Sequence, residues 1–245
     1  MKSSIYAVVI FFLFTNTSWS NPALILNDEN LPPEFEASYD VRKGSMRVGK
    51  MKVSLRQIGD ELIYESITIP VGMAALFLGK QEITDRAVLK IFENSYRSSE
   101  FKHEIKGSDK NRNEHYIFDW DKNKANVQYK DRNNTLDISP YTFDNFSVQL
   151  LLMRKPNVEI TAFTYTVISK GRLKDYTYKL EPNESIKTKL GNFSANKFVR
   201  KKDDEKKTTY LGWYAESLHY IPVKLDKIEN GKIDISIQIT EINWL

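Results

Sequence analysis

The dominant pattern along the chain is an alternation of apolar and polar side chains with a period of two. Residues 35–41 read FEASYDV, and residues 233–239 read IDISIQI. Successive side chains of a β-strand point to opposite faces, so this pattern is typical of strands with one buried and one solvated face. Similar alternation recurs between these two segments, and the chain as a whole predicts about a dozen strands.

Short polar turns separate many of the predicted strands. Lys170-Gly171 and Asn230-Gly231 have the composition of two-residue hairpin turns. Short links join antiparallel neighbours, because a parallel crossover needs a dozen or more residues. The apolar phase changes parity near Gly49, which predicts a β-bulge there. We therefore expect a mainly β protein with a strongly curved antiparallel sheet. The alternation does not distinguish an open from a closed barrel-like sheet.

Residues 142–154 depart from the alternation. Their apolar residues at helical spacing are Phe143, Phe146, Leu150 and Met153. This spacing predicts one amphipathic α-helix of about three turns, packed against the open side of the sheet. Asp144 or Thr142 can cap its start, and Pro156 ends it.

The N-terminus has the pattern of a secretory signal peptide. Lys2 precedes an apolar run from Ile5 to Phe14, and small residues lead up to Ser20. The apolar run is shorter than the roughly 20 residues that a membrane-spanning helix needs. We expect cleavage after Ser20, export to the periplasm, and no transmembrane span afterwards. The predicted organisation is a signal peptide over 1–20, a lead-in segment over 21–33 and a single β-rich domain over 34–245.

Composition narrows the classes of function. The 245 residues contain no cysteine, which excludes disulfides, a thiol nucleophile, iron–sulfur clusters and thiolate zinc sites. The net charge of +4 is too small to indicate a nucleic-acid partner.

Motifs for catalysis or metal binding are missing from the sequence. The three histidines are His103, His115 and His219, and their spacing does not form a local metal motif. The chain also lacks a Gly-X-Ser-X-Gly elbow, a phosphate loop and a dinucleotide fingerprint. We therefore predict no cofactor, no metal and no enzymatic activity. A Ser–His–Asp set assembled from distant positions stays open as an alternative, because such sets are defined by geometry.

Three further features each allow two interpretations. The uncharged segment Pro70–Gly79 is either a short helix that plugs one end of the barrel or a lid at a cavity mouth. The charged run 200–207 is either a solvated hairpin tip or a patch for anionic lipid or polysaccharide. A set of aromatic residues either lines a cavity or fills the core. Its members are Tyr165, Tyr176, Tyr178, Tyr210, Trp213 and Tyr214.

Several blocks of sequence resemble the bacterial exported proteins of domain-of-unknown-function family 3108. These blocks are residues 35–41, 48–49, 72–78, 144–150, 170–176 and 213–223. The resemblance runs from about Leu31 to the C-terminus. It implies an exported, β-rich protein of the cell envelope, and it carries over no activity, cofactor or catalytic residue.

The leading hypothesis is a periplasmic, non-enzymatic binding or carrier module for a hydrophobic envelope ligand such as a lipid acyl chain. We expect an apolar cavity that opens near residues 71–79. The predicted ligand contacts are Met73, Leu76, Phe77, Leu78, Phe146, Leu150 and Trp213. One alternative is a structural or protein-interaction module of the envelope without a cavity, with an envelope protein as partner. A weaker alternative is a hydrolase that acts on envelope polymers.

Overall fold

The structure is a computed structural model that describes residues 31–79, 81–92, 95–108, 112–202 and 207–245. The predicted signal peptide over 1–20 and most of the predicted lead-in segment lie outside the described residues.

Fifteen strands of the described residues form one sheet. They are β1 (Phe35–Lys43), β2 (Met46–Ile58), β3 (Glu61–Pro70), β4 (Glu82–Phe92), β5 (Ser95–Lys106), β6 (Glu114–Asp119), β7 (Lys124–Tyr129), β8 (Arg132–Asp137), β9 (Thr142–Asp144), β10 (Ala162–Ser169), β11 (Arg172–Lys187), β12 (Asn192–Lys201), β13 (Thr209–Ala215), β14 (Ile221–Glu229) and β15 (Lys232–Trp244). The prediction of a mainly β protein with an antiparallel sheet is confirmed.

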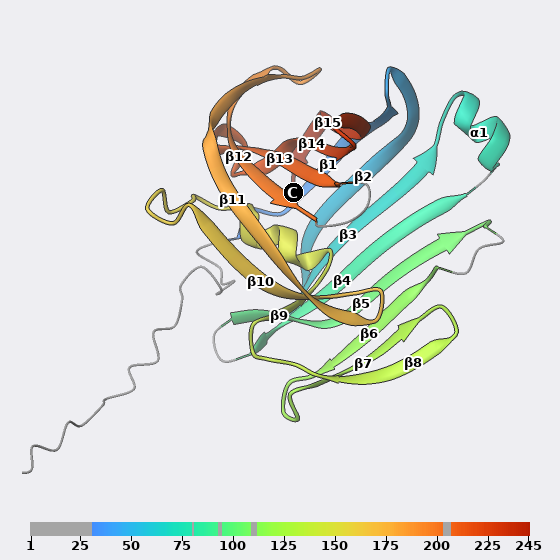
Figure 1. Ribbon diagram of the computed structural model, residues 1–245, viewed down its shortest axis with the longest axis vertical. Coiled ribbons are helices and arrows are strands. Elements are labelled where there is room, and N and C mark those ends of the chain that lie inside the picture. The colour runs from blue at the N-terminus through green and yellow to red at the C-terminus, as the bar shows by residue number, and fades with distance from the viewer. Residues whose placement is uncertain (1–30, 80, 93–94, 109–111, 203–206) are drawn as a thin grey trace, which may run out of the picture.

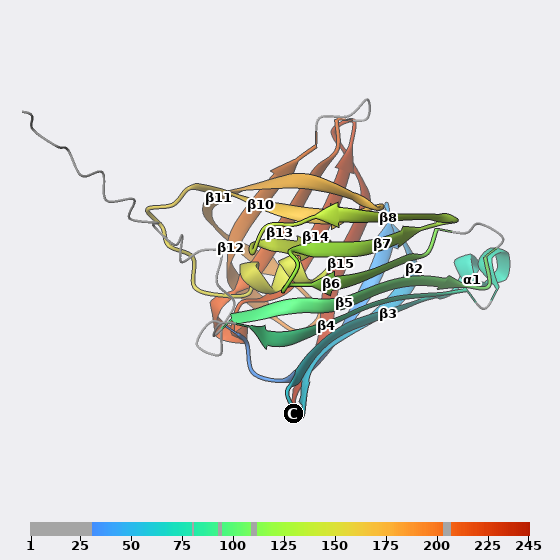
Figure 2. The same cartoon turned by 90° about the horizontal axis from the view of Figure 1, so that it is seen from below.

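The first and last strands of the chain are neighbours in the middle of the sheet. The strand order runs from β8 down to β1, then passes to β15 and down to β9. All neighbouring pairs are antiparallel except β9 with β10. The sheet twists so strongly that β3 to β8 run across the direction of β13 to β15 in Figure 2. Its edge strands, β8 and β9, do not pair with each other, so the sheet is open.

The two halves of the open sheet nevertheless touch through the β10–β11 turn. The amide of Lys170 donates to Glu114 Oε2 at 2.8 Å, and the amide of Gly171 donates to Tyr116 Oη at 3.2 Å. Gly171 has φ of 68°, and a Cβ built there would lie 3.1 Å from the Cβ of Tyr129. Glycine is therefore needed both for the turn and for the close approach. These contacts bend the sheet into a barrel-like shell without a closing ladder.

The local turn predictions agree with the structure. Lys170-Gly171 and Asn230-Gly231 form the β10–β11 and β14–β15 turns with positive φ. The register of β1 and β2 shifts beside Gly49, as the parity change predicts. The polar strands β5 and β8 were not predicted, because their sequences show little apolar alternation.

The predicted amphipathic α-helix over 142–154 is wrong. Residues 142–144 form β9, and a 3₁₀ helix, η3 (Ser147–Leu152), follows. The residues of the predicted apolar face are buried, and so are Val148, Leu151 and Leu152, which lie outside that face. Apolar residues around most of the segment are therefore buried, and its apolar spacing does not define one helical face.

The core lies between η3 and the inner face of the sheet (Figure 1). The ring of Phe146, which precedes η3, stacks on Tyr64 of β3 with 4.1 Å between ring centroids. Two other short helices in the described residues are α1 (Met73–Leu78) and the 3₁₀ helix η4 (Glu216–Leu218). Across the described ranges, no helix has the length and apolar character needed to cross a membrane.

Candidate functional site: an aromatic and cationic cavity

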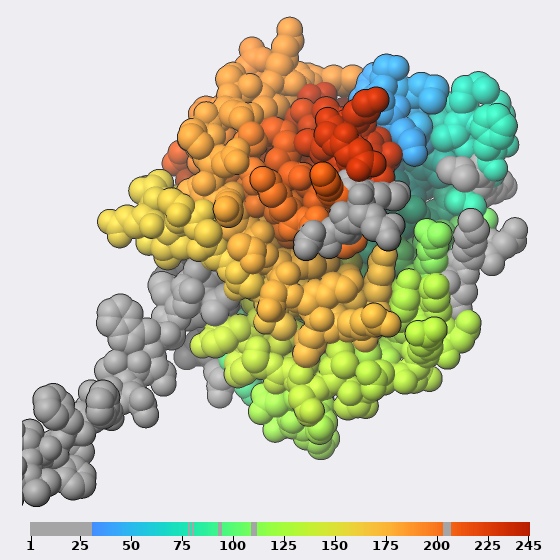
Figure 3. All heavy atoms as spheres, viewed as in Figure 1, coloured from blue at the N-terminus to red at the C-terminus, as the bar shows by residue number. Residues whose placement is uncertain are grey.

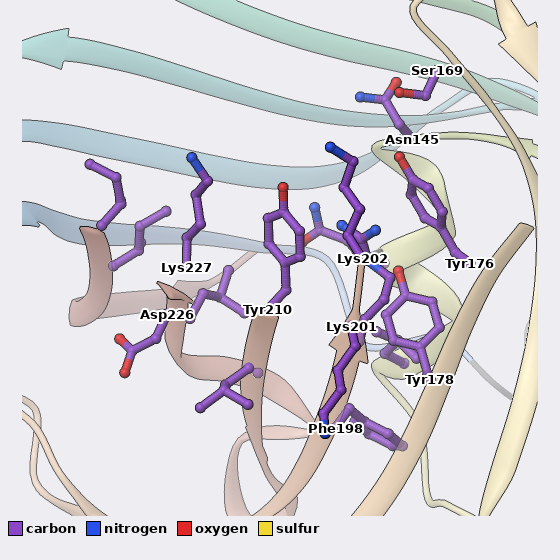
Figure 4. A pocket seen from close by; sticks show the side chains of 18 of the residues that line it. Asn145, Ser169, Tyr176, Tyr178, Phe198, Lys201, Lys202, Tyr210, Asp226 and Lys227 are labelled. Atoms are coloured by element: carbon purple, nitrogen blue, oxygen red, sulfur yellow. The ribbon is translucent and has the colours of Figure 1, made fainter. Parts of the chain in front are cut away.

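A cavity of about 840 Å³ opens on the inner face of strands β10 to β15, next to η3 (Figure 4). Its lining comes from six strands that the antiparallel register aligns side by side. Its volume lies within the range of small-molecule sites, which is roughly 300–1,000 Å³.

The floor of the cavity is apolar. Phe198, Gly212, Leu225 and Ile237 form one row across β12 to β15, because each is opposite the next in the ladder. A Cβ at Gly212 would lie 2.7 Å from Cε2 of Tyr214, so the tyrosine ring crosses this position closely. The missing side chain at Gly212 is what lets this ring and the cavity fit together.

An arginine lies between two tyrosine rings in the cavity wall. The guanidinium carbon of Arg200 is 4.0 Å from the ring centroid of Tyr176 and 4.0 Å from that of Tyr210. The two rings come from β11 and β13, the strands on either side of Arg200 in β12. Cation–π contacts on both sides therefore hold the guanidinium in place.

The cavity wall also contains a buried polar atom without a partner. Oδ1 of Asn145 lacks a hydrogen-bond partner among the described residues, although the atom is buried. Buried polar atoms in proteins are normally satisfied by protein, water or ligand.

The predicted ligand-contact residues of α1 lie away from this cavity. Met73, Leu76 and Phe77 are 61%, 76% and 82% exposed, and Leu78 is the last residue of α1. In Figure 3, α1 (turquoise) projects from the rim of the molecule. The interpretation of this segment as a plug is wrong, because a plug would bury these side chains. The described lining of the 840 Å³ cavity includes no residue of α1.

The other predicted contacts are divided between two places. Phe146 and Leu150 are brought together in the core around η3. Trp213 lies on the face of β13 opposite Gly212 and Tyr214, where its indole N–H donates to Glu184 Oε2 at 2.8 Å. The structure thus does not gather the predicted contacts into one pocket, and their role in ligand binding stays a prediction.

Four of the aromatic residues that the sequence singled out do line the cavity. They are Tyr176, Tyr178, Tyr210 and Tyr214. Tyr165 is in the core, where it contacts Phe143 with 5.9 Å between ring centroids. Sequence reasoning missed Arg200, Gly212 and Leu225. The available signal was the alternate spacing of Phe198 with Arg200 and of Tyr210 with Gly212 on two neighbouring strands.

The histidines do not form a catalytic set with a hydroxyl. His103 Nδ1 lies 2.7 Å from Asp85 Oδ1, and Ser66 Oγ donates to Asp85 Oδ2 at 3.4 Å. The carboxylate is therefore in the middle, whereas a nucleophilic serine needs the histidine next to it. His115 pairs with a different carboxylate, and His219 follows η4. This geometry gives the hydrolase hypothesis no support, and the described part of the chain holds no group of three metal-ligating side chains.

Burial and a carboxylate act in opposite directions on His103. Burial disfavours the charged imidazolium, but the Asp85 carboxylate outweighs it and the pKa of His103 is raised.

Comparison with known proteins gives a family and a fold. The family model described as protein of unknown function (DUF3108) matches residues 35–238. No curated protein matches the chain. A beta-barrel-like protein of domain of unknown function DUF1849 from Brucella abortus superposes with a TM-score of 0.57 at 9% identity, over 90% of this chain and 99% of that one. At this identity the likeness concerns the fold alone.

Two further structures are more distant. A protein described as exported, with a YmcC-like fold, from Bacteroides fragilis has a TM-score of 0.36 at 8% identity, over 89% of this chain and 98% of that one. A chain of the MucA/MucB complex from Pseudomonas aeruginosa has a TM-score of 0.38 at 10% identity, over 87% of this chain and 52% of that one.

Proposed function

The chain belongs to the DUF3108 family, whose function is unknown, and we propose that it is a non-enzymatic binding module of the periplasm that carries an apolar envelope ligand such as a lipid acyl chain. The observation that supports this most is the 840 Å³ cavity with its apolar floor. The signal-peptide pattern of residues 1–20 supports export. Residues 21–33 and 34–245 are then the lead-in segment and the single exported domain.

Removal of apolar surface from water drives binding in this proposal. Each buried methylene contributes roughly 0.8 kcal/mol, which is close to a fourfold change in affinity. Affinity for a homologous series of acyl chains should therefore rise steeply with chain length. The rise should stop when the chain fills the floor row of Phe198, Gly212, Leu225 and Ile237.

Native mass spectrometry of protein purified without detergent, combined with organic extraction, tests the proposal. A stoichiometric apolar molecule is the expected result, and its identity would give the ligand class. Leu225→Asn, which places an amide in the floor, should lower acyl-chain affinity at least about tenfold. Leu173→Asn is the matched control, because Leu173 is exposed and does not line the cavity.

Two results would contradict the proposal. One is a clean apo mass that stays unchanged after incubation with envelope lipids. The other is an affinity that does not depend on chain length in the wild-type protein, a measurement that stands even if Leu225→Asn fails to fold.

The exposed apolar side chains of α1 favour a second candidate function, a module that binds an envelope protein. Soluble domains rarely leave neighbouring large apolar side chains such as Leu76 and Phe77 uncovered without a partner. If the purified protein carries and takes up no lipid, chemical crosslinking in intact cells from a cysteine placed at Ala74 would test this candidate. A specific adduct that Phe77→Asp removes would support it, and the absence of any adduct would contradict it.

A further inference from the structure

We propose that the cavity recognises an amphiphile with an anionic head, a phosphate or a carboxylate, which Arg200 binds while the apolar tail occupies the floor. This inference rests on the proposed function and adds the chemistry of the polar end of the ligand. Lys170 and Lys174 lie in the same wall and add to the cationic surface, and Lys201, Lys202 and Lys227 also line the cavity.

The position of Arg200 suits it to bind an oxyanion. Tyr176 and Tyr210 flank the guanidinium and Tyr178 accepts a hydrogen bond from it, so the remaining N–H groups along its edge are the part left to bind a ligand. Among the described residues, no carboxylate forms an ion pair with Arg200. A planar, held guanidinium presents paired N–H donors that match the oxygens of a carboxylate or phosphate.

The carboxylates in the cavity lining do not neutralise this surface. Asp226 is 2.8 Å from Lys224 Nζ and accepts from Ser236 Oγ at 2.6 Å. In Figure 4 its carboxylate points to the side opposite Lys227. Asp175 precedes Tyr176 in β11, so the pleat directs it to the other face, where Thr166 Oγ1 donates to it at 3.1 Å.

Not every lysine of the lining contributes. Lys227 Nζ is 2.5 Å from Glu229 Oε1 and 3.3 Å from Asp234 Oδ2, so its charge is already balanced. Lys170 and Lys174 have no such ion pair among the described residues. The uncompensated positive charge therefore lies on the side of the cavity formed by β11, β12 and the β10–β11 turn.

The pKa of Lys174 also indicates positive charge that no partner balances. Burial lowers its pKa, and the neighbouring Lys170 lowers the pKa further, while Glu114 opposes the change. Glu114 is itself engaged by the amide of Lys170 and by the Tyr116 hydroxyl. An ammonium group that is desolvated and next to like charges gains stability from an added anion.

The head and the tail of one ligand can reach both parts of the site. Arg200 and Phe198 are two residues apart on β12, on the same face. Two residues of a strand span about 7 Å, which is the length of a few methylene groups. A single molecule can therefore place its anion at Arg200 and its chain along the floor row.

Binding of three dodecyl compounds below their micelle concentration tests the inference. Dodecyl phosphate and dodecanoate carry the two candidate anions, and dodecanol is the uncharged control with the same chain. We expect the wild-type protein to bind at least one anion at least about tenfold more tightly than dodecanol, since one charge-assisted hydrogen bond is worth that much. The anion that binds more tightly identifies the head group.

Two substitutions and the salt dependence of binding test whether Arg200 causes the preference for an anionic head group over dodecanol. Arg200→Gln should remove the preference for the anion over dodecanol. Arg56→Gln, the same change of charge on an exposed residue of β2, should leave that preference as it is in the wild type. If Arg200→Gln does not fold, the salt dependence of the wild-type protein decides, because salt should weaken binding of the anion and not of dodecanol.

The outcomes separate the two proposals. Binding of all three compounds with equal affinity would overturn the anionic head group and leave the apolar carrier function standing. Binding of none of them would overturn the carrier function itself.

Discussion

Replacing Asp144 by alanine is expected to destabilise the fold strongly, because this buried carboxylate connects η3 to the sheet. Its Oδ1 accepts from the amides of Phe146 and Ser147 at 2.9 and 2.7 Å. Its Oδ2 accepts from the hydroxyls of Ser98 in β5 and Ser147, each at 2.5 Å. Asp144 thus satisfies the amides at the start of the 3₁₀ helix and ties the helix to a strand far away in sequence.

The size of the effect follows from the donors that remain. The two serine hydroxyls are 2.9 Å apart and can pair with each other, so alanine leaves two amides and one hydroxyl without an acceptor. Each buried donor without an acceptor costs about 1–3 kcal/mol, and removing the carboxylate recovers the energy that its burial cost. We therefore expect the free energy of unfolding to fall by about 3–6 kcal/mol. Burial raises the pKa of Asp144, against the hydrogen bonds that favour its charged form, so burying this carboxylate has an energetic cost that the alanine variant removes.

Urea unfolding followed by tryptophan fluorescence measures this loss. Asp137→Ala is the matched control, because that carboxylate is 90% exposed and its 2.7 Å pair with Lys124 is worth about 1 kcal/mol or less. Asp144→Asn keeps an acceptor for both amides and should lose clearly less than the alanine variant. An Asp144→Ala variant no less stable than the Asp137→Ala control would refute the reasoning.

Two further predictions concern the pH dependence of stability and the exposed helix α1. The raised pKa of His103 means that the folded state binds the proton of this side chain more tightly than the unfolded state does. Protonated His103 therefore adds to the free energy of unfolding below the unfolded pKa of about 6.5, and this addition is lost as pH rises through the folded pKa. The stability difference between wild type and His103→Gln should shrink as pH rises above about 6.5, measured by urea unfolding; a difference independent of pH would contradict the pairing with Asp85. Phe77→Asp should change the unfolding free energy by less than about 0.5 kcal/mol, because the ring is exposed, and should abolish acyl-ligand uptake from vesicles. Ile58→Asp, at another exposed position, is its control, and undiminished uptake by the Phe77→Asp variant would remove α1 from the binding route.

Features set by neighbouring residues were predictable from the sequence. The alternation in 35–41 and 233–239 predicts β1 and β15, because the period of a strand is a local property. Gly171 and Gly231 mark turns for the same reason. The segment 142–154 was mispredicted, since burial of most of its residues places apolar side chains at many spacings, helical ones included.

The cavity depends on register and curvature, which one sequence does not reveal. Arg200 begins a run of mixed charges that has the composition of a solvated hairpin tip. It lies in the cavity wall because it shares a strand face with Phe198 and pairs with Tyr210 across the ladder. Tyr176 reaches the same arginine from the strand on the other side. Alternation alone assigns each of these residues to a face but does not bring them together.

The pairing of β1 with β15 has a consequence for how the chain folds. Residues 35–43 emerge early in synthesis, yet one side of this strand is completed only by residues 235–244 at the end of the chain. The amide of Leu245 also donates to the carbonyl of Glu34 at 3.1 Å, which extends the contact between these two strands. Such pairing gives the fold a high contact order and a slow, late closing step. Until that step, β1 has an open edge able to accept another strand, so the chain needs protection from aggregation for as long as its own last strand is missing.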